Sequence, residues 1–432
     1  MEVSKLINNK KIINGWAFYD WANSAYFLVI STAIFPNYFI ANTADHIKFF
    51  GFDIANSAFY SFLVSIAYII IALTTPVLSG VADYSGNRKN FLKTFTVFGS
   101  MACIALFWFS GEESMWVGII AFVVATVGCA GSLVFYDSFL PDIASEDQYD
   151  KVSARGYSYG YIGSVILLVF ILFMYNKPHL FGIEDEVLPL RIGFILVGLW
   201  WISFAQITFR RLPKFRIGKT DKEAILVKGF RQIKKAYKGL KHKPQTKRYL
   251  YSFFFYFSGV QTVVYLASAF ASKVLGFEAQ ELIVIILILQ IIAVPGAMLF
   301  AYIAKIKSNK FSMLLMITIW AAICIAASFV AEKAPFYIIA GFVGLVLGGI
   351  QSMSRSTYSK MLDKDEEDVT CYYSFYDFLY KASVVFGTAL FAILEIVFDD
   401  MRISVFGLAV LFIISFFILM TVTIKREPSI AS

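Results

Sequence analysis

The sequence alternates between long apolar runs and shorter polar or basic connections. Twelve apolar runs are long enough to cross a bilayer, which takes roughly 20 residues of helix. They cover residues 16–40, 55–79, 91–110, 115–139, 157–175, 190–209, 249–271, 281–304, 312–330, 335–359, 371–397 and 402–424. Six runs precede a long polar connection and six follow it, so the pattern predicts an all-helical membrane protein with two six-helix halves, at 1–209 and 249–432.

The connection at 210–248 is basic and separates the two halves. Apolar residues recur between its lysines at helical spacing, at Ile225, Phe230, Ile233, Tyr237 and Leu240. This spacing predicts an amphipathic helix lying on the membrane surface. We expect it to join the halves and to anchor itself to anionic lipid, and the alternative is a binding site for a regulatory partner.

Charge placement then orients the spans. Of the 38 lysines and arginines, 31 lie on the side of the N-terminus, six lie on the other side, and Lys381 falls within a span. The positive-inside rule therefore places both termini in the cytoplasm. The net charge of +8 reflects this topology and does not indicate nucleic-acid binding. The first fifteen residues lack the apolar core of a cleaved signal peptide, and a bacterial inner membrane is the simplest placement.

The composition excludes several other protein classes. Hydrophobic residues make up 59% of the 432 residues and charged residues 16%, which is typical of a polytopic membrane protein. The four cysteines are scattered and the three histidines lie far apart, so we expect no metal site, disulfide set or cofactor. No paired catalytic carboxylates, Ser-His-Asp set or nucleotide loop is visible, so we do not expect an enzyme.

The first span carries a polar face. Asp20, Asn23 and Ser24 stand at i, i+3 and i+4 and share one side of a helix, and Tyr19, Asn23 and Tyr26 form the adjoining stripe. A carboxylate inside a membrane costs about 2.5 to 3.5 kcal/mol on insertion scales. We interpret this face as the lining of an aqueous pathway. The alternatives are a buried polar patch against another helix, or an aspartate at the membrane surface.

Three uncharged side chains extend this candidate substrate pathway into the second half. Tyr256 and Gln261 fall in the seventh span and Gln290 in the eighth, at middle depth. Uncharged polar groups at this depth suit a small polar solute. Hydrogen bonds between helices are the alternative interpretation, for these residues as for Asn23 and Ser24.

The connection between the second and third spans reads GVADYSGNRK. Its Gly80, Asp83, Gly86, Arg88 and Lys89 resemble the short loop signature of the major facilitator superfamily, although the leading glycine comes one place late. The resemblance implies that the aspartate pairs with basic residues and a helix end to latch one conformation. The corresponding loop of the second half, at 305–310, lacks the acid. An ordinary charged turn is the alternative.

Three further segments make the resemblance specific. FYDWANSAY, the block from YDSFLPD to RGYSYGYIG, and GGIQSMSRS resemble, in order, the vacuole effluxer family, which includes the autophagy-related vacuolar amino-acid exporter and bacterial members. Asp363 departs from the proline expected there. The resemblance implies the major facilitator fold, with paired three-helix repeats in each half, and secondary transport. It also implies amino acids as the first substrate class.

Charged and polar residues gather near the predicted cytoplasmic ends of the spans. Besides Asp20, they are Asp137, Gln351, Arg355, Asp377 and Lys381. Asp377 and Lys381 stand at i and i+4 and are predicted to pair. We interpret the group as a gate in which Asp20 or Asp137 pairs with Arg355 or Lys381. The alternative is proton carriage by Asp20, Asp137 and Asp377, since burial raises the pKa of a carboxyl group.

Together these features predict alternating-access transport of a small polar solute by a monomer, with protons as the candidate coupling ion. Two alternatives stay open. One is a transporter-like sensor that binds a solute without moving it. The other is a transporter of lipid or of another metabolite.

Overall fold

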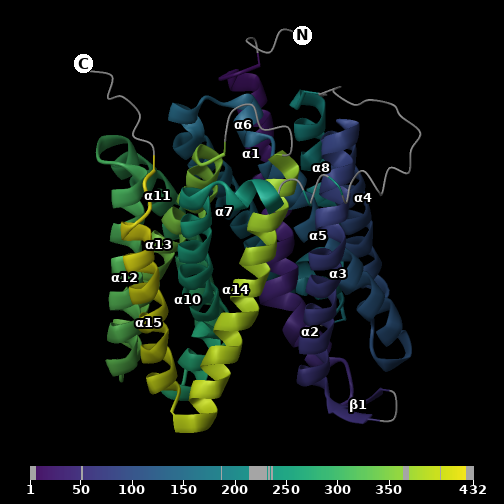
Figure 1. The fold of residues 1–432 in the computed structure, drawn as a ribbon. Coiled ribbons are helices and arrows are strands. Elements are labelled where there is room, and N and C mark those ends of the chain that lie inside the picture. Colours follow the sequence, from purple (N-terminus) through teal and green to yellow (C-terminus); the bar gives the residue numbers. More distant parts are fainter. Residues whose placement is uncertain are drawn as a thin grey trace. The chain divides into compact units, whose positions relative to one another are not determined.

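A computed structural model describes residues 6–49, 52–185, 187–213, 231, 234, 237–362, 369–398 and 400–424. It contains twelve helical segments that are long and apolar enough to cross a membrane (Figure 1). These segments are Lys10–Ala41, Phe62–Ala82, Arg88–Trp108, Glu112–Ile143, Glu146–Asn176, Leu188–Arg211, Pro244–Ala267, Glu281–Ile306, Asn309–Phe329, Lys333–Lys360, Val369–Phe398 and Met401–Met420. The predicted twelve-span helical architecture is confirmed.

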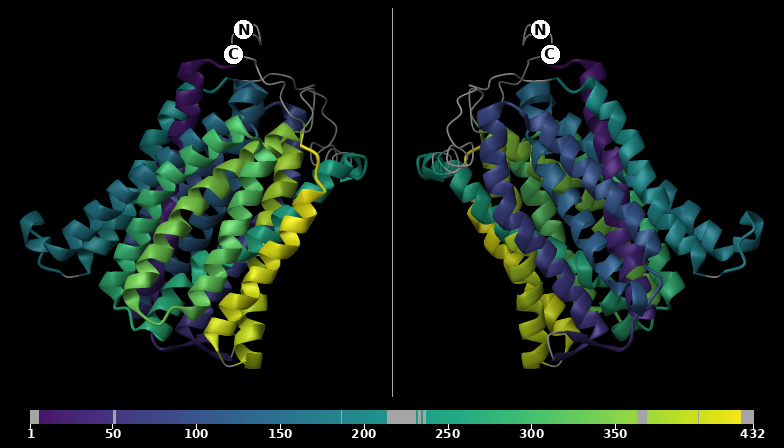
Figure 2. Two further views of the ribbon diagram at one scale, coloured as in Figure 1. Left: turned by 90° about the vertical axis from the view of Figure 1, so that its left-hand side faces the viewer. Right: turned by 90° about the vertical axis from the view of Figure 1, so that its right-hand side faces the viewer.

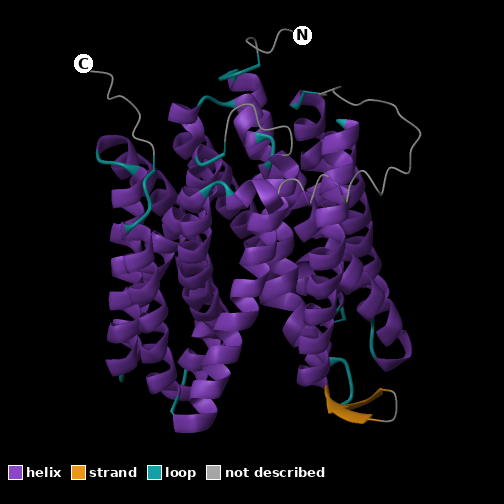
Figure 3. Cartoon of the chain, in the orientation of Figure 1, coloured by secondary structure: helices purple, strands orange, loops and turns teal. Residues whose placement is uncertain are grey.

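Helices account for nearly every element of the described chain (Figure 3). The α-helices are α1 (Lys10–Ala25), α2 (Phe35–Ala41), α3 (Asn56–Ser85), α4 (Arg88–Ala105), α5 (Met115–Asp137), α6 (Leu140–Ile143), α7 (Tyr149–Asn176), α8 (Leu188–Arg211), α10 (Pro244–Leu275), α11 (Ala279–Ile306), α12 (Asn309–Phe329), α13 (Lys333–Lys360), α14 (Val369–Phe398) and α15 (Met401–Met420). A π-helix, Tyr26–Ile34, joins α1 to α2. Strands β1 (His46–Phe49) and β2 (Phe52–Ala55) pair antiparallel, with His46 opposite Ala55.

The chain forms two compact units, and Figure 2 shows their helices from two sides. We call Lys10–Phe139 with Tyr159–Ile233 the N-terminal unit. We call Met1–Asn9, Leu140–Ser158 and Lys234–Ser432 the C-terminal unit. The segment Leu140–Ser158 lies within the first six spans of the sequence, yet it packs with the last six. This segment brings the start of α7 to the helices of the second half.

In the N-terminal unit, α4 packs against α5 and α8, α3 packs against α5, and α1 packs against α8. Glycines permit the closest of these contacts. A Cβ atom added at Gly128 of α5 would lie 2.5 Å from the Cα of Gly99 on α4. Without side chains at these two positions, the helices approach backbone to backbone.

In the C-terminal unit, α11 packs along α13, α10 packs against α14 and α15, and α12 packs against α15. The glycine face of α13 fixes the first of these contacts. A Cβ atom at Gly344 would lie 2.6 Å from the carbonyl oxygen of Leu289, and one at Gly348 would lie 2.0 Å from that of Ala293. The close fit sets the position of α13, which carries the buried charges described below.

The predicted amphipathic helix falls mainly outside the described residues. Of its apolar positions, Ile225, Phe230 and Ile233 lie outside them. Residues 237–241 are helical, and the ring of Tyr237 lies 5.9 Å from that of Phe375 on α14, between centroids. Its role on a membrane surface stays a prediction.

Candidate functional site

Asp20 lies on α1 facing α5, inside the N-terminal unit. Its side chain is buried, and the hydroxyl of Tyr136 on α5 donates a hydrogen bond to its Oδ2 over 2.8 Å. The indole Nε1 of Trp16 donates to the carbonyl oxygen of Tyr136 over 3.0 Å, and the two rings stack with centroids 4.5 Å apart. A buried carboxylate is costly unless hydrogen bonds satisfy it. Tyr136 and Trp16 therefore hold Asp20 as part of one contact between α1 and α5.

Three other polar residues of the first span make hydrogen bonds to α4 and α5. Tyr19 shares a hydrogen bond of 2.7 Å with Thr96, and Tyr26 shares one of 2.6 Å with Thr126. The Nδ2 of Asn23 donates to the Sγ of Cys129 over 3.3 Å and to the Oγ of Ser132 over 3.4 Å. We call the residues Tyr19, Asp20, Asn23, Tyr26 and Tyr136 the α1–α5 seam. These bonds match the buried-patch interpretation, and the lining of an aqueous pathway stays a prediction.

Ser24 takes a different side of α1 and is half-buried. A Cβ atom at Gly160 of α7 would lie 2.3 Å from its Oγ, so the absence of a side chain at Gly160 leaves room for this hydroxyl. The polar face predicted from sequence is thus divided between two neighbouring helices, α5 and α7.

The π-helix Tyr26–Ile34 follows the seam directly. The hydroxyl of Thr32 donates to the carbonyl oxygen of Phe27, five residues earlier, over 2.8 Å. A π-turn in a helix redirects the side chains that follow it and is frequent at functional sites. The regular helical spacing that we assumed for the first span therefore ends at Ala25, and nothing in the sequence indicated this change.

The loop signature ends α3 and contacts the ends of two other helices of the N-terminal unit, α5 and α8. Gly86 adopts a φ of 67°, a left-handed conformation that glycine tolerates and that ends α3. The guanidinium of Arg88 donates to the carbonyl oxygen of Ser138, at the end of α5, over 3.0 Å, and Lys89 donates to that of Leu212, at the end of α8, over 2.5 Å. Cations at helix C-termini are favourable because of the helix dipole. Gly80 is buried, and the side chain of Asp83 lies outside the described residues.

A charged cluster joins α7 to α13 inside the C-terminal unit. Arg355 is the largest charged side chain that is fully buried among the described residues. Its Nε donates to the Oγ of Ser153 over 2.9 Å and its Nη2 to the carbonyl oxygen of Ser153 over 3.0 Å. The guanidinium carbon also lies 4.3 Å from the ring centroid of Tyr157, at the distance of a cation–π contact. The hydroxyl of Ser153 donates in turn to the carbonyl oxygen of Ser352 over 2.8 Å.

An ion pair lies beside Arg355 in the same cluster. The Nζ of Lys360 is 2.8 Å from the Oδ2 of Asp150, with 6% and 9% of the two side chains exposed. Asn309 completes the pair, since its Nδ2 donates to Asp150 over 2.7 Å and its Oδ1 accepts from Lys360 over 3.0 Å. A buried ion pair is tolerated when further hydrogen bonds satisfy it, as they do here. We call Asp150, Ser153, Tyr157, Asn309, Arg355 and Lys360 the α7–α13 cluster.

The residues predicted from the sequence include Arg355 but not Asp150, Asn309 or Lys360. Asp150 and Lys360 are 210 positions apart, and no periodicity within one helix joins them. Their only signal in the sequence is that each is a polar residue in a connection beside a predicted span.

A second ion pair lies within α14. Asp377 and Lys381 form a salt bridge one helical turn apart, with 16% and 4% of their side chains exposed, so the predicted pairing is confirmed. Asp137, at the end of α5, and Gln351, on α13, are half-buried. The predicted pairing of Asp20 or Asp137 with Arg355 or Lys381 stays a prediction.

Two glutamines in the C-terminal unit carry unsatisfied polar atoms. Gln261 is 4% exposed, and among the described residues its Nε2 has no hydrogen-bond partner; the same is true of the buried Oε1 of Gln290. The hydroxyl of Tyr256, in the same helix, is satisfied by Ser354, with 2.7 Å between the hydroxyl oxygens. Buried polar atoms are nearly always hydrogen-bonded, so an unpartnered amide favours a ligand or water as its partner.

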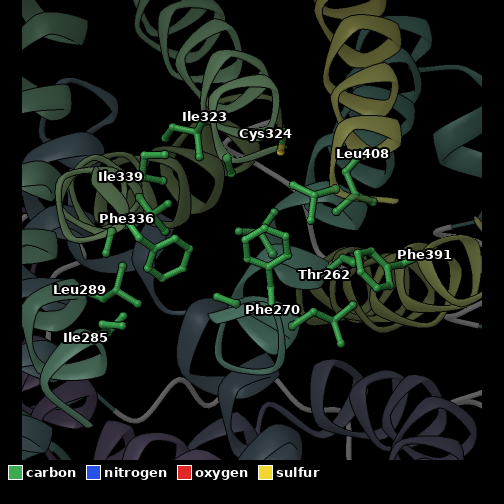
Figure 4. A pocket seen from close by; sticks show the side chains of 17 residues that line it. Thr262, Phe270, Ile285, Leu289, Ile323, Cys324, Phe336, Ile339, Phe391 and Leu408 are labelled. Carbon is green, nitrogen blue, oxygen red and sulfur yellow. The ribbon is translucent and has the colours of Figure 1, made fainter. Parts of the chain in front are cut away.

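A small apolar cavity of about 50 Å³ lies among the helices of the C-terminal unit (Figure 4). Phe270, Phe336 and Phe391 contribute its largest side chains. Thr262 also lines it, and the Thr262 hydroxyl already donates to the carbonyl oxygen of Ser258. An apolar cavity of this kind stays dry and does not suit a polar solute. No group of three histidine, cysteine or acidic side chains that could hold a metal lies within the part of the chain that the structure describes.

The family model and the similar proteins found by comparison all describe one type of protein. The family described as "Vacuole effluxer Atg22 like" matches residues 8–429. The "Uncharacterized MFS-type transporter YxiO" of Bacillus subtilis is 29% identical over 94% of this chain and 93% of its own. Autophagy-related protein 22 of Vanderwaltozyma polyspora is 24% identical over 98% of this chain and 93% of its own.

Two solved structures share the fold. The transporter FucP in its outward conformation superposes with a TM-score of 0.70 at 12% identity, over 96% of this chain and 98% of its own. A bacterial homologue of the iron transporter ferroportin gives 0.65 at 13% identity, over 95% and 98% of the two chains. At this identity the likeness concerns the fold alone.

Proposed function

Because the chain belongs to the vacuole effluxer Atg22-like family of major facilitator transporters, we propose that it moves amino acids across a membrane by alternating access. Its family and fold are those of multi-pass membrane transporters and not of enzymes. The amino-acid substrate is supported by the chemistry of the buried charges.

The Asp377–Lys381 pair carries the argument for a zwitterionic substrate. An α-amino acid presents an ammonium and a carboxylate a few ångströms apart. Asp377 offers a negative charge for the ammonium, and Lys381, one helical turn away, offers a positive charge for the carboxylate. When a zwitterion binds, the two residues can exchange their mutual salt bridge for one bond each to the substrate. Every charge then stays paired, as it must in a site without water. The unpartnered amides of Gln261 and Gln290 add a hydrogen-bond donor and acceptor in the same unit. With Tyr256 and the α1 residues Tyr19, Asp20, Asn23, Ser24 and Tyr26, they are the candidate pathway.

The α7–α13 cluster is the candidate gate. It ties a segment of the first six spans to α13 through a buried ion pair and a buried arginine. In a transporter of two rocking halves, such a contact holds one conformation and must break for the other to form. The loop residues Gly80, Asp83, Gly86, Arg88 and Lys89, with Asp137, are proposed to support the same transition from the N-terminal unit. Gln351 on α13 is proposed to support it from the C-terminal unit.

Orientation, coupling and assembly complete the proposal. The lysine and arginine distribution supports cytoplasmic termini, and the Bacillus relative supports a bacterial membrane. We propose protons as the coupling ion, carried by Asp20, Asp137 or Asp377, and a monomer as the transporting unit.

Uptake and counterflow of a labelled amino-acid panel in proteoliposomes test the proposal. The expected result is saturable flux that grows when a pH gradient is imposed and that Lys381→Met reduces. Empty liposomes and Lys273→Met, which removes an exposed lysine, serve as controls.

Each other outcome has a defined meaning. Saturable flux that does not change with the pH gradient would contradict proton coupling but support amino-acid transport. Binding of an amino acid without counterflow favours a sensor. Folded protein that neither binds nor moves any amino acid contradicts the proposed substrate class.

A further inference from the structure

A second cavity, of about 630 Å³, lies beside the α7–α13 cluster in the C-terminal unit. It is bounded by the start of α7, the connection from α11 to α12, the end of α13 and the residues after α15. Its charged lining consists of five lysines and two aspartates, at Lys151, Lys305, Lys307, Lys310, Lys360, Asp147 and Asp150. The lining therefore has an excess of three positive charges.

Both aspartates already have hydrogen-bond or ion-pair partners, so they do not pair with the remaining lysines of the cavity. Asp150 pairs with Lys360, and Asp147 accepts hydrogen bonds from Ser145 and Gln148. Lys310 donates to the carbonyl oxygen of Met420. Among the described residues, the side-chain ammonium groups of the exposed Lys151, Lys305 and Lys307 make no hydrogen bond or salt bridge. Like charges that share one cavity repel each other unless an anion lies between them.

The apolar side of the cavity indicates where such an anion comes from. Met298 and Tyr302 of α11 line it, with 46% and 62% of their surfaces exposed, and both fall within a membrane-spanning segment. A phospholipid can lay its chains along this side of α11 and place its phosphate among the lysines. A soluble phosphate would use only the basic side.

We propose that this cavity binds the phosphate of an anionic phospholipid from the adjoining leaflet. The bound phosphate bridges Lys151, which belongs to the segment from the first six spans, and Lys305 and Lys307 of the second half. By neutralising their repulsion it holds the start of α7 against the end of α11, and so stabilises the neighbouring contact between α7 and α13. The site is independent of which solute is transported, and its occupant acts on the stability of the candidate gate.

Native mass spectrometry of the purified protein, titrated with phosphatidylglycerol or phosphatidylcholine, tests the site. The variant is Lys305→Gln with Lys307→Gln. The matched control is Lys10→Gln with Lys11→Gln, which removes the same charge from exposed lysines at the start of α1, outside the cavity. At about 1 kcal/mol per lysine, the cavity variant should bind phosphatidylglycerol about 30-fold more weakly. The control should bind it as the native protein does.

Thermal unfolding adds a readout for the gate contact. Phosphatidylglycerol should raise the unfolding temperature of the native protein and of the control more than phosphatidylcholine does, and should not do so for the cavity variant. Equal phosphatidylglycerol affinity for the native protein and the cavity variant would overturn the proposal.

Inorganic phosphate separates the two sources of the anion. If it stabilises the native protein through Lys305 and Lys307 while phosphatidylglycerol has no effect, the phosphate site stands and the lipid is rejected. If inorganic phosphate has no effect on the native protein and phosphatidylglycerol does, the lipid is supported. Because neither assay measures flux, these outcomes do not depend on the proposed substrate.

Discussion

In the described part of the C-terminal unit, two buried lysine–aspartate pairs are built in opposite ways. Asp150 and Lys360 come from α7 and α13, and Asn309 of α12 satisfies both of them. Asp377 and Lys381 lie one turn apart on α14, and each is the other's ion-pair partner. The first pair depends on where three helices lie. The second depends only on α14 being helical.

This difference separates the work that each pair can do. A pair between helices breaks when the start of α7 leaves α13, so its energy is a property of one conformation. A pair within a helix persists in every conformation that keeps the helix, so its charges stay available for a substrate or a proton. We therefore assign conformational control to Asp150–Lys360 and solute recognition to Asp377–Lys381.

The largest effect is expected for Lys360→Met. It leaves Asp150 as an unpaired buried charge, which costs about 3 to 5 kcal/mol in the state where α7 contacts α13. The unfolding temperature, measured by tryptophan fluorescence, should fall by several degrees. Lys273→Met is the matched control: it breaks an exposed pair with Glu395, which contributes only about 0 to 1 kcal/mol.

A double replacement sharpens this prediction. Asp150→Leu with Lys360→Met removes both charges and should recover most of the stability lost in the single variant, because no unpaired charge remains. A double variant as unstable as Lys360→Met would show that the pairing itself does not stabilise the contact.

Lys381→Met is expected to affect transport more than stability. Asp377 can take up a proton when its partner is removed, which limits the destabilisation, whereas the substrate carboxylate loses a charge-assisted bond of about 1.5 to 3 kcal/mol. Counterflow should show an apparent affinity about 10- to 100-fold weaker, with a small change in unfolding temperature. Unchanged affinity would reject Lys381 as a substrate ligand.

Gln261→Leu should give the smallest effect on stability, and in the favourable direction. It removes a buried donor that has no partner among the described residues, a group that costs about 1 to 3 kcal/mol when unsatisfied. The unfolding temperature should stay the same or rise while flux falls. Gln206→Leu on α8, an exposed position, should change neither quantity. A Gln261→Leu protein with native flux would remove Gln261 from the pathway.

The same contrast explains what could be predicted from the sequence. Apolar run length predicted all twelve spans, and i, i+4 spacing predicted the Asp377–Lys381 pair, because both are properties of a local stretch. The spacing also marked the polar residues of the first span, but not their partners on α4 and α5. Asp150–Lys360 was missed because one sequence contains no record of which distant helices meet. The π-helix was missed because hydrophobic periodicity assumes a regular helix.

Cross-linking Asp150 to Lys360 tests the central claim, that the contact between α7 and α13 opens in every transport cycle. Both positions are changed to cysteine in a protein whose four native cysteines are replaced by serine, and a short bis-thiosulfonate reagent bridges the new pair. Bridging is verified by intact mass, and each single-cysteine variant is treated in parallel. We predict that bridged protein in proteoliposomes loses counterflow and regains it after reduction. Full counterflow by bridged protein would contradict the claim.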